Sequence, residues 1–214
     1  AEFNYFDKIE IRSYKPTHFG HPGQIKKILK MIYGAKSPVL ITGGGIISSG
    51  ASQDLLRFAE MTNIPVTTTL MGLGGFPSSH KLSLGMPGMH GTVYANMALT
   101  EADILISVGS RFDDRVTGKL AEFAPNAKII HIDIDPTSIS KNIKVDVPIV
   151  GDAQNVLSQL VEETDESKLP SFDSWHKKIK EWKKKHPLKY KQRDNGKIKP
   201  QYVIEEICKQ TKGA

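Results

Sequence analysis

The stretch ILISVGSRFDDR, residues 104–115, decides the fold class of this 214-residue chain. It opens with five residues that are apolar apart from one serine, and a glycine follows directly. A short apolar run that ends at a glycine is typical of a strand buried on both faces of a sheet. Similar runs predict four more strands, at residues 38–41, 64–69, 128–132 and 147–150, and Leu82-Ser83-Leu84 suggests a sixth.

Amphipathic helical segments lie between these predicted strands. Ile25, Ile28, Leu29 and Ile32, for example, recur at the spacing of one helix face. Apolar strands that alternate with helices indicate a parallel sheet covered on both faces. The sequence therefore predicts an α/β fold, a doubly wound parallel sheet of about six strands with a helical C-terminal extension.

Composition excludes several classes of protein. Cys208 is the single cysteine, which excludes a disulfide framework and a thiolate metal cluster. The seven histidines show no zinc-like spacing, and only His90, next to glycines, stands in an interesting place. No apolar run approaches the roughly 20 residues of a membrane-spanning helix, and residues 1–4 do not read as a signal peptide. We expect no metal, no membrane association and a reducing, cytoplasmic location.

Positive charge is concentrated in one segment. Residues 176–199 hold eleven Lys and Arg against two acids, an excess of nine in a chain of net charge +6, so the rest is mildly acidic. Phe172, Trp175, Ile179 and Trp182 recur at helical spacing, which favours a helix packed on the protein with its lysines in water. The alternative is a nucleic-acid-binding module, which would bind with a steep salt dependence. We expect no nucleic-acid partner.

Candidate binding residues follow the predicted strands, where open parallel sheets bind their ligands. The triplet Gly43-Gly44-Gly45 follows one strand. Its backbone N–H groups would reach a phosphate, or the glycines merely permit a tight turn. The triplet is not the G-x-G-x-x-G fingerprint, and no acid ends a strand about 20 residues later, which argues against a nicotinamide dehydrogenase.

Charged residues follow two further strands. Arg111 and Arg115 flank two aspartates, and they either pair with them or clamp an anionic group with their planar guanidinium forks. A carboxylate at Asp133 suits ribose hydroxyls, whereas Asp135, before a proline, is typical of a helix cap. Gly151 and the residue after it offer another backbone approach at the last strand end.

Groups that would perform chemistry are missing from the pattern. Met71, Met86 and Met89 either line an adaptable apolar pocket or fill gaps. Ser48 and Ser49 have no neighbouring base, and the chain has no paired catalytic carboxylates, P-loop lysine or nucleophile elbow. The residues alone predict a dinucleotide-binding sheet without an evident catalytic group.

Four collinear motifs carry a resemblance to a known family: TLMG (69–72), GMHGTVYAN (88–96), GSRFDDRVTGKL (109–120) and KIIHIDIDPTSISKN (128–142). With them, essentially the whole chain resembles the large, catalytic subunit of acetolactate synthase (acetohydroxyacid synthase), a thiamine-diphosphate enzyme. The resemblance implies a Rossmann-like central domain that binds FAD in an extended pose. The glutamate that activates thiamine and the magnesium-diphosphate motif G-D-G…N of this family do not occur here.

The resemblance also implies a domain organisation. Residues 1–20 would be the lead-in from a missing N-terminal thiamine-pyrimidine domain, and 21–162 the central FAD-binding domain. Residues 163–199 would be a linker with the amphipathic basic helix, and 200–214 the first helix of a truncated C-terminal thiamine-pyrophosphate domain. No later segment buries Val203, Ile204 and Ile207, so we expect the chain to be a fragment.

Activity and partners follow from the same resemblance. The full-length enzyme would condense pyruvate with pyruvate or 2-oxobutanoate in valine, leucine and isoleucine biosynthesis, with thiamine diphosphate and Mg²⁺ on domains absent here. FAD would do no net redox work, and this chain alone would be inactive. The expected partners are the missing domains, further copies in a homo-oligomer and a regulatory small subunit, in the cytoplasm or, in a eukaryote, a plastid or mitochondrion. The alternative is the central domain of another thiamine-diphosphate oxidase or decarboxylase that binds FAD, ADP or neither.

Family contacts carried over by motif give a candidate cofactor site and a substrate pocket. Arg115 and Met89 would also lie near the second 2-oxo acid. The implied FAD contacts are Arg12, Gly43, Gly44, Gly45, Thr69, Leu70, Met71, Gly88, Met89, His90, Gly109, Arg111, Asp113, Arg115, Val116, Asp133, Ile134, Gly151 and Asp152.

Overall fold

A computed structural model describes residues 15–191 and 196–211 of the chain. Its centre is a parallel sheet of five strands in the order β2-β1-β3-β4-β5. The strands are β1 (Pro38–Thr42), β2 (Val66–Thr68), β3 (Ile104–Val108), β4 (Lys128–Asp133) and β5 (Val147–Val150). In register, Leu40 pairs with Val66 on one side and Ile106 on the other. The predicted α/β class and parallel sheet are confirmed.

The suggested sixth strand is only a single bridge. Ser83 pairs in parallel with Val66, and neighbouring backbone hydrogen bonds join Leu82 and Leu84 to Val66. Gly85 follows with a φ of +71°, and its carbonyl oxygen still accepts the Thr68 N–H of β2 at 3.1 Å. At the opposite edge, β5 carries Pro148 at an exposed position.

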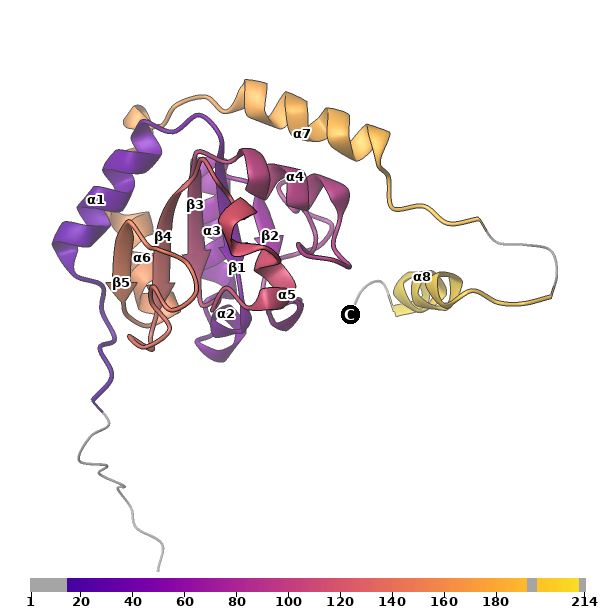
Figure 1. Cartoon of the computed structure of the whole chain (residues 1–214), viewed down its shortest axis with the longest axis horizontal. Helices are drawn as coiled ribbons and strands as arrows, with labels where there is room; N and C mark the ends of the chain where they lie inside the picture. The colour runs from indigo at the N-terminus through magenta and orange to yellow at the C-terminus, as the bar shows by residue number, and fades with distance from the viewer. Residues whose placement is uncertain (1–14, 192–195, 212–214) are drawn as a thin grey trace, which may run out of the picture.

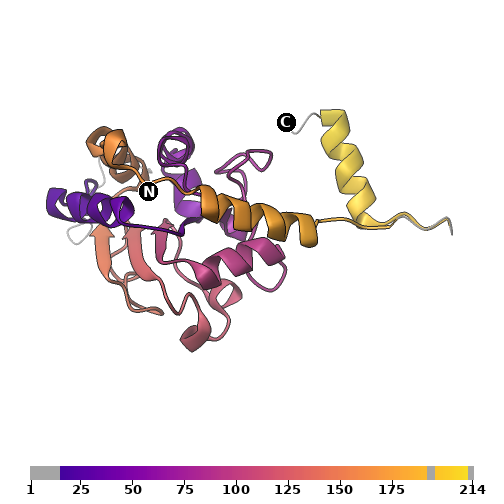
Figure 2. The ribbon, with the colours of Figure 1, turned by 90° about the horizontal axis from the view of Figure 1, so that it is seen from above.

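Helices cover both faces of the sheet (Figures 1 and 2). On one face, α1 (Pro22–Tyr33), α3 (Ser52–Thr62) and α6 (Ala153–Glu163) pack together, and the short α2 (Gly44–Ser48) lies beside them. On the other lie α4 (Val93–Glu101) and the single turn α5 (Asp114–Thr117). In the part of the chain that the structure describes, the connections also contain three 3₁₀ turns, η1 (Leu70–Gly72), η2 (Leu120–Glu122) and η3 (Glu166–Lys168).

Helix α7 (Asp173–Lys185) crosses the amino ends of the strands (Figure 1). The Trp175 indole nitrogen donates to the Pro38 carbonyl oxygen at 3.1 Å, where β1 begins, and its ring packs edge-on against Trp182. Lys183 Nζ donates to the Ser83 carbonyl oxygen at 2.6 Å, and Lys178 pairs with Glu101. The predicted packing of the apolar side of this helix is therefore confirmed, and two of its lysines also bind the protein.

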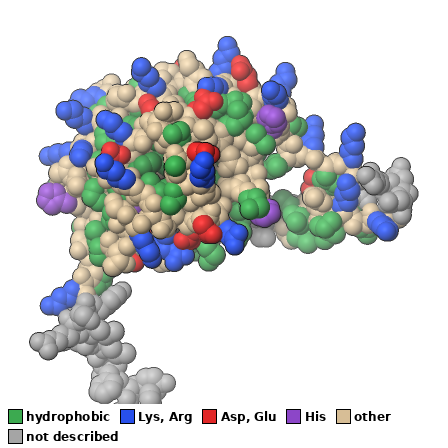
Figure 3. Space-filling model, viewed as in Figure 1, with side chains coloured by type: hydrophobic (Ala, Val, Ile, Leu, Met, Phe, Trp, Pro, Cys, Tyr) green, Lys and Arg blue, Asp and Glu red, His purple; other side chains and the backbone are tan. Residues whose placement is uncertain are grey.

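Helix α8 (Pro200–Thr211) stands apart from the sheet in both ribbon views. It has no buried residue, and the space-filling view shows apolar side chains gathered on it (Figure 3). Tyr202, Val203, Ile204 and Ile207 are its exposed large apolar residues. Within the described ranges, no helix is both long enough and apolar enough to cross a membrane.

Candidate functional site

The candidate site lies at the carboxyl ends of the strands, opposite α7. Strands β1 and β3 are neighbours in the sheet, but the chain leaves them toward opposite edges, and such a switch point is where open α/β sheets bind ligands. A cleft of about 600 Å³ opens there. Its lining is Gly43, Gly44, Gly45, Ser48, Ser49, Thr69, Leu70, Met71, Gly109, Ser110, Arg111, Asp113, Arg115, Val116, Asp133, Ile134, Asp135, Ser138, Asp152 and Ala153.

Two glycine turns meet at the floor of this cleft. A Cβ on Gly43 would stand 2.2 Å from the Gly109 carbonyl oxygen, and a Cβ on Gly109 would stand 2.6 Å from the Gly45 Cα. Real Cβ contacts are essentially never shorter than 3.0 Å, so this approach requires glycine. Only glycine therefore lets the turn after β1 lie against the turn after β3.

The glycine N–H groups are largely used within the protein. Gly43 N–H donates to the Val108 carbonyl oxygen at 3.0 Å, and Gly45 N–H donates to that of Gly109 at 3.1 Å. Of the two interpretations of the triplet, the close turn is the one observed at these two positions. The turns shape the cleft floor, and the N–H groups of Gly43 and Gly45 are already engaged within the protein.

Arg111 and Arg115 are the cations that line the cleft within the described ranges. Arg111 Nη2 lies 3.1 Å from an Asp113 carboxylate oxygen, and Arg115 Nε lies 3.9 Å from one of Asp114. The arginine side chains are 70% and 83% exposed, and exposed pairs of this kind contribute only about 0–1 kcal/mol. An anionic ligand can therefore replace the aspartates at little cost, so ion pairing and anion clamping are compatible.

The two aspartates at the carboxyl end of β4 differ in role. Asp133 is buried at the strand end, and its Oδ1 accepts the Asp135 N–H at 2.9 Å. Asp135 accepts the Thr137 hydroxyl and backbone N–H and the Ser138 hydroxyl, and the Thr137 hydroxyl above all holds its pKa below the ordinary value. The expected cap at Asp135 is thus observed as a turn. Both aspartates line the cleft, but only Asp133 keeps a carboxylate oxygen, Oδ2, that accepts no hydrogen bond within the turn.

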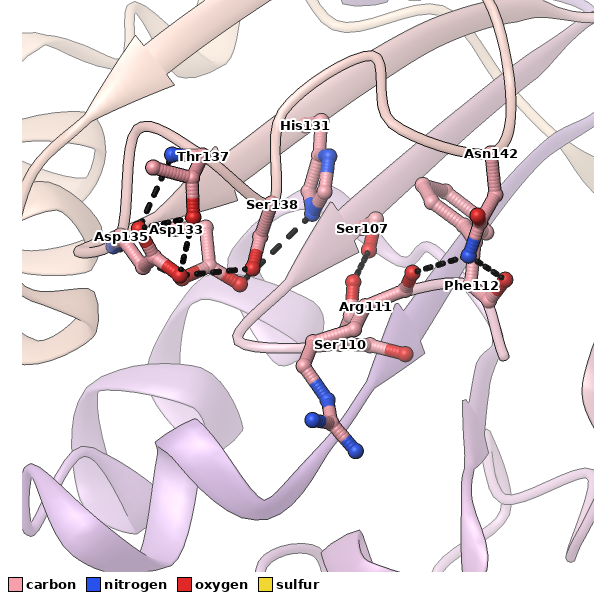
Figure 4. A network of polar contacts seen from close by, with 10 residues as sticks. All are labelled: Ser107, Ser110, Arg111, Phe112, His131, Asp133, Asp135, Thr137, Ser138 and Asn142. Atoms are coloured by element: carbon pink, nitrogen blue, oxygen red, sulfur yellow. Dashed lines mark hydrogen bonds and ion pairs between the residues drawn. The ribbon is translucent and has the colours of Figure 1, made fainter.

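Behind this rim lies a network that Figure 4 shows at close range. Phe112 is buried with a φ of +54°, unusual for a bulky residue, and Asn142 Nδ2 donates to its carbonyl oxygen at 2.9 Å. The Phe112 ring packs edge-on against His131 of β4, with centroids 5.0 Å apart. Asn142 thereby fixes the turn that carries Arg111.

Most of the predicted contacts come together, and some do not. Gly88, Met89, His90 and Gly151 do not line the cleft, and Arg12 lies outside the described residues. Met89 is 80% exposed, and a Cβ on Gly88 would stand 2.3 Å from the Arg115 carbonyl oxygen. This loop therefore supports the Arg115 turn from outside the cleft.

Sequence reasoning missed part of the lining. Ser110 and Ser138 follow β3 and β4, and Ala153 follows the cap of α6, so their position just past a strand was the available signal. Ser48 and Ser49, considered only as nucleophiles, line the cleft from α2 and the residue after it. Asp152 caps α6 by accepting the Gln154 and Asn155 N–H groups. Across the described residues, no group of three or more His, Cys, Asp or Glu suits a metal ion.

Comparison with known proteins gives the family. Residues 25–160 match the family model described as thiamine pyrophosphate enzyme, central domain. The chain belongs to this family. As a thiamine pyrophosphate enzyme central domain it places its cleft at the strand ends, as the order of strands requires.

Similar curated proteins are acetolactate synthase large subunits. That of Haemophilus influenzae is 50% identical over 214 residues, which are 99% of this chain and 37% of the relative. Isozyme 3 of Escherichia coli is 48% identical over 97% of this chain and 37% of its own length. The probable large subunit of Methanocaldococcus jannaschii is 51% identical over 94% of this chain and 34% of its own length. The chain thus spans little more than a third of the relatives it matches.

Proposed function

We propose that this chain is the FAD-binding central domain of an acetolactate synthase large subunit. The observation that carries the proposal is the span of the cleft. Residues just past every strand of the sheet line it, from Leu70 and Met71 beyond β2 to Asp152 and Ala153 beyond β5. A ligand that contacts all of them must be extended, as FAD is with its adenosine, pyrophosphate, ribityl chain and flavin ring.

The residues of the cleft fit that ligand. Arg111 and Arg115 suit a pyrophosphate because a guanidinium donates two parallel hydrogen bonds to anionic oxygens. Asp133 suits ribose hydroxyls, which donate to a carboxylate. Leu70 and Met71 are 69% and 74% exposed, and they offer apolar surface to a flat ring. A volume of about 600 Å³ also lies in the usual range of ligand pockets, roughly 300–1,000 Å³.

In the acetolactate reaction there is no net oxidation, so FAD would supply shape and position while thiamine diphosphate carries the bond-making chemistry. This chain's residues would bind and orient FAD. We further propose the boundaries expected from the sequence, with residues 21–162 as the binding domain. The partners would be thiamine- and Mg²⁺-binding domains, further copies and a small subunit, with branched-chain amino-acid synthesis in the cytoplasm or an organelle as the setting.

The first test is direct binding. FAD should raise the melting temperature of the purified chain more than ADP or FMN does, because it contacts the whole cleft. Arg111→Ala should weaken FAD binding about tenfold, the lower end for a charge-assisted hydrogen bond at an exposed group. Arg57→Ala removes an arginine of α3 that does not line the cleft, and it should leave binding unchanged.

Either of two outcomes of the melting measurement would contradict this proposal. Equal shifts with FAD and ADP would favour the alternative, an ADP-binding central domain of another thiamine-diphosphate enzyme, and no FAD shift would exclude a flavin site.

A separate assay supplies pyruvate, thiamine diphosphate, Mg²⁺ and FAD and follows acetolactate. We expect no product from this chain alone, and turnover would refute its role as a binding domain only.

A further inference from the structure

His131 stands out among the buried side chains. It occupies β4 with no exposed surface, and neither ring nitrogen has a hydrogen-bond partner. Among the residues that the structure describes, no other side chain leaves a buried nitrogen or oxygen without a partner. Burial of such a group costs free energy that an apolar residue would avoid, so its presence calls for an explanation.

The unpartnered ring faces a residue of the cleft. His131 Nε2 lies 3.7 Å from Asp133 Oδ2, beyond the roughly 3.2 Å limit of an ordinary N–H···O bond. The other carboxylate oxygen of Asp133 already accepts the Asp135 N–H. Figure 4 shows the imidazole behind the strand end, with the Asp133 carboxylate between it and the Asp135 turn. One small movement of the carboxylate would complete a hydrogen bond.

We propose that His131 is a positioning residue for ligand binding. Its Nε2–H donates to Asp133 Oδ2 when a ligand hydroxyl pair engages the carboxylate, and this bond fixes the carboxylate's orientation. Edge-on packing against Phe112 holds the imidazole in place, so the ring is presented to Asp133 at one angle. The inference rests on the proposed nucleotide site, since it assigns to Asp133 the ribose hydroxyls of that ligand.

Three variants test this with FAD as the probe. His131→Leu should raise the dissociation constant for FAD about tenfold while the melting temperature of the free protein stays equal or rises, because the unpartnered nitrogens are gone. His131→Gln retains an N–H donor and should bind within about threefold of the wild type. Thr62→Val is the control. It removes a buried hydroxyl of α3 that donates to the Phe58 carbonyl oxygen, away from the cleft, and should change the melting temperature without changing the affinity for FAD.

A double-mutant cycle separates positioning from packing. If His131 acts through Asp133, His131→Leu should cost less than about twofold in an Asp133→Ala background, where the acceptor is gone. The imidazole Nε2 proton resonance should also move when FAD binds the wild type, and stay in place when FAD binds Asp133→Ala.

The outcomes are distinguishable. If FAD does not bind the wild type, the proposed function and this inference both fail. If FAD binds the wild type and Asp133→Ala weakens that binding, an unchanged affinity of His131→Leu overturns the inference alone. The inference also fails by itself if the tenfold loss persists without the Asp133 carboxylate.

Discussion

Gly109→Ala tests whether the two glycine turns build the cleft. The new Cβ would stand 2.6 Å from the Gly45 Cα and 3.1 Å from its backbone N and C. These are backbone atoms, which cannot rotate away. Gly109 also has a φ of +58°, where alanine is strained by about 1–2 kcal/mol. Gly50→Ala is the matched control, because Gly50 has a φ of +71° but nothing within 4 Å of its added Cβ.

The difference between the two variants isolates the clash. Overpacking costs about 1–3 kcal/mol, and an immobile backbone obstacle puts Gly109→Ala near 3 kcal/mol beyond the control. In a chain of this size that corresponds to a melting temperature about 6–12 °C lower than that of Gly50→Ala. Urea denaturation, followed by tryptophan fluorescence, measures this difference in the free energy of unfolding. An unchanged m-value would show that both variants expose the same surface on unfolding. If both variants unfold at the same urea concentration, the turns are not in contact as described.

Two further predictions concern the C-terminal part of the fold. Trp175→Phe should lower the free energy of unfolding by about 1–2 kcal/mol in thermal or urea denaturation, because the buried bond to the Pro38 carbonyl oxygen is lost. Trp182→Phe should cost less, because this residue is held by ring contacts with Trp175 and Lys178 that a smaller aromatic ring partly retains. Lys168, with help from Ser167, holds the pKa of the Asp165 carboxyl at about 2, so Lys168→Ala should raise it toward the ordinary 3.8 in an NMR titration. The stabilisation from the Asp165 carboxylate is complete above pH 3.8 and is lost as the pH falls through about 2. If Asp165 still titrates at about 2 in Lys168→Ala, Lys168 is not what lowers its pKa.

The strands were predictable because each is a short apolar run that ends at a breaker. Ile104–Val108 matched to the residue, whereas the run at 64–69 contributes only Val66–Thr68. A run such as Leu82-Ser83-Leu84 cannot reveal how far it pairs, because that depends on how the loop after β2 brings the run back beside this strand. Apolar character indicates that a run is buried, but how many of its residues pair with a neighbouring strand depends on how the loops place that run.

The cleft was predictable for the same reason, since parallel strands bring their carboxyl ends to one edge. The sequence could not place residues 88–90. They do not directly follow a strand of the sheet, so the sheet does not fix their position relative to the carboxyl ends of the strands. Nor could it single out His131, since a lone histidine in an apolar strand reads as core. His90 drew interest instead, yet it lies outside the cleft. Only the unpartnered nitrogens distinguish His131.

The two edges of the sheet bear on how this chain behaves at high concentration. An exposed edge strand is a template on which another molecule can add a strand, the usual route to aggregation. On β2 that position is taken by the bridge at Ser83, whose carbonyl oxygen also binds Lys183. On β5, Pro148 has no N–H to donate to an added strand. Both edges are therefore poor templates for another strand, and we expect solutions of this chain to resist growth of amyloid-like sheets.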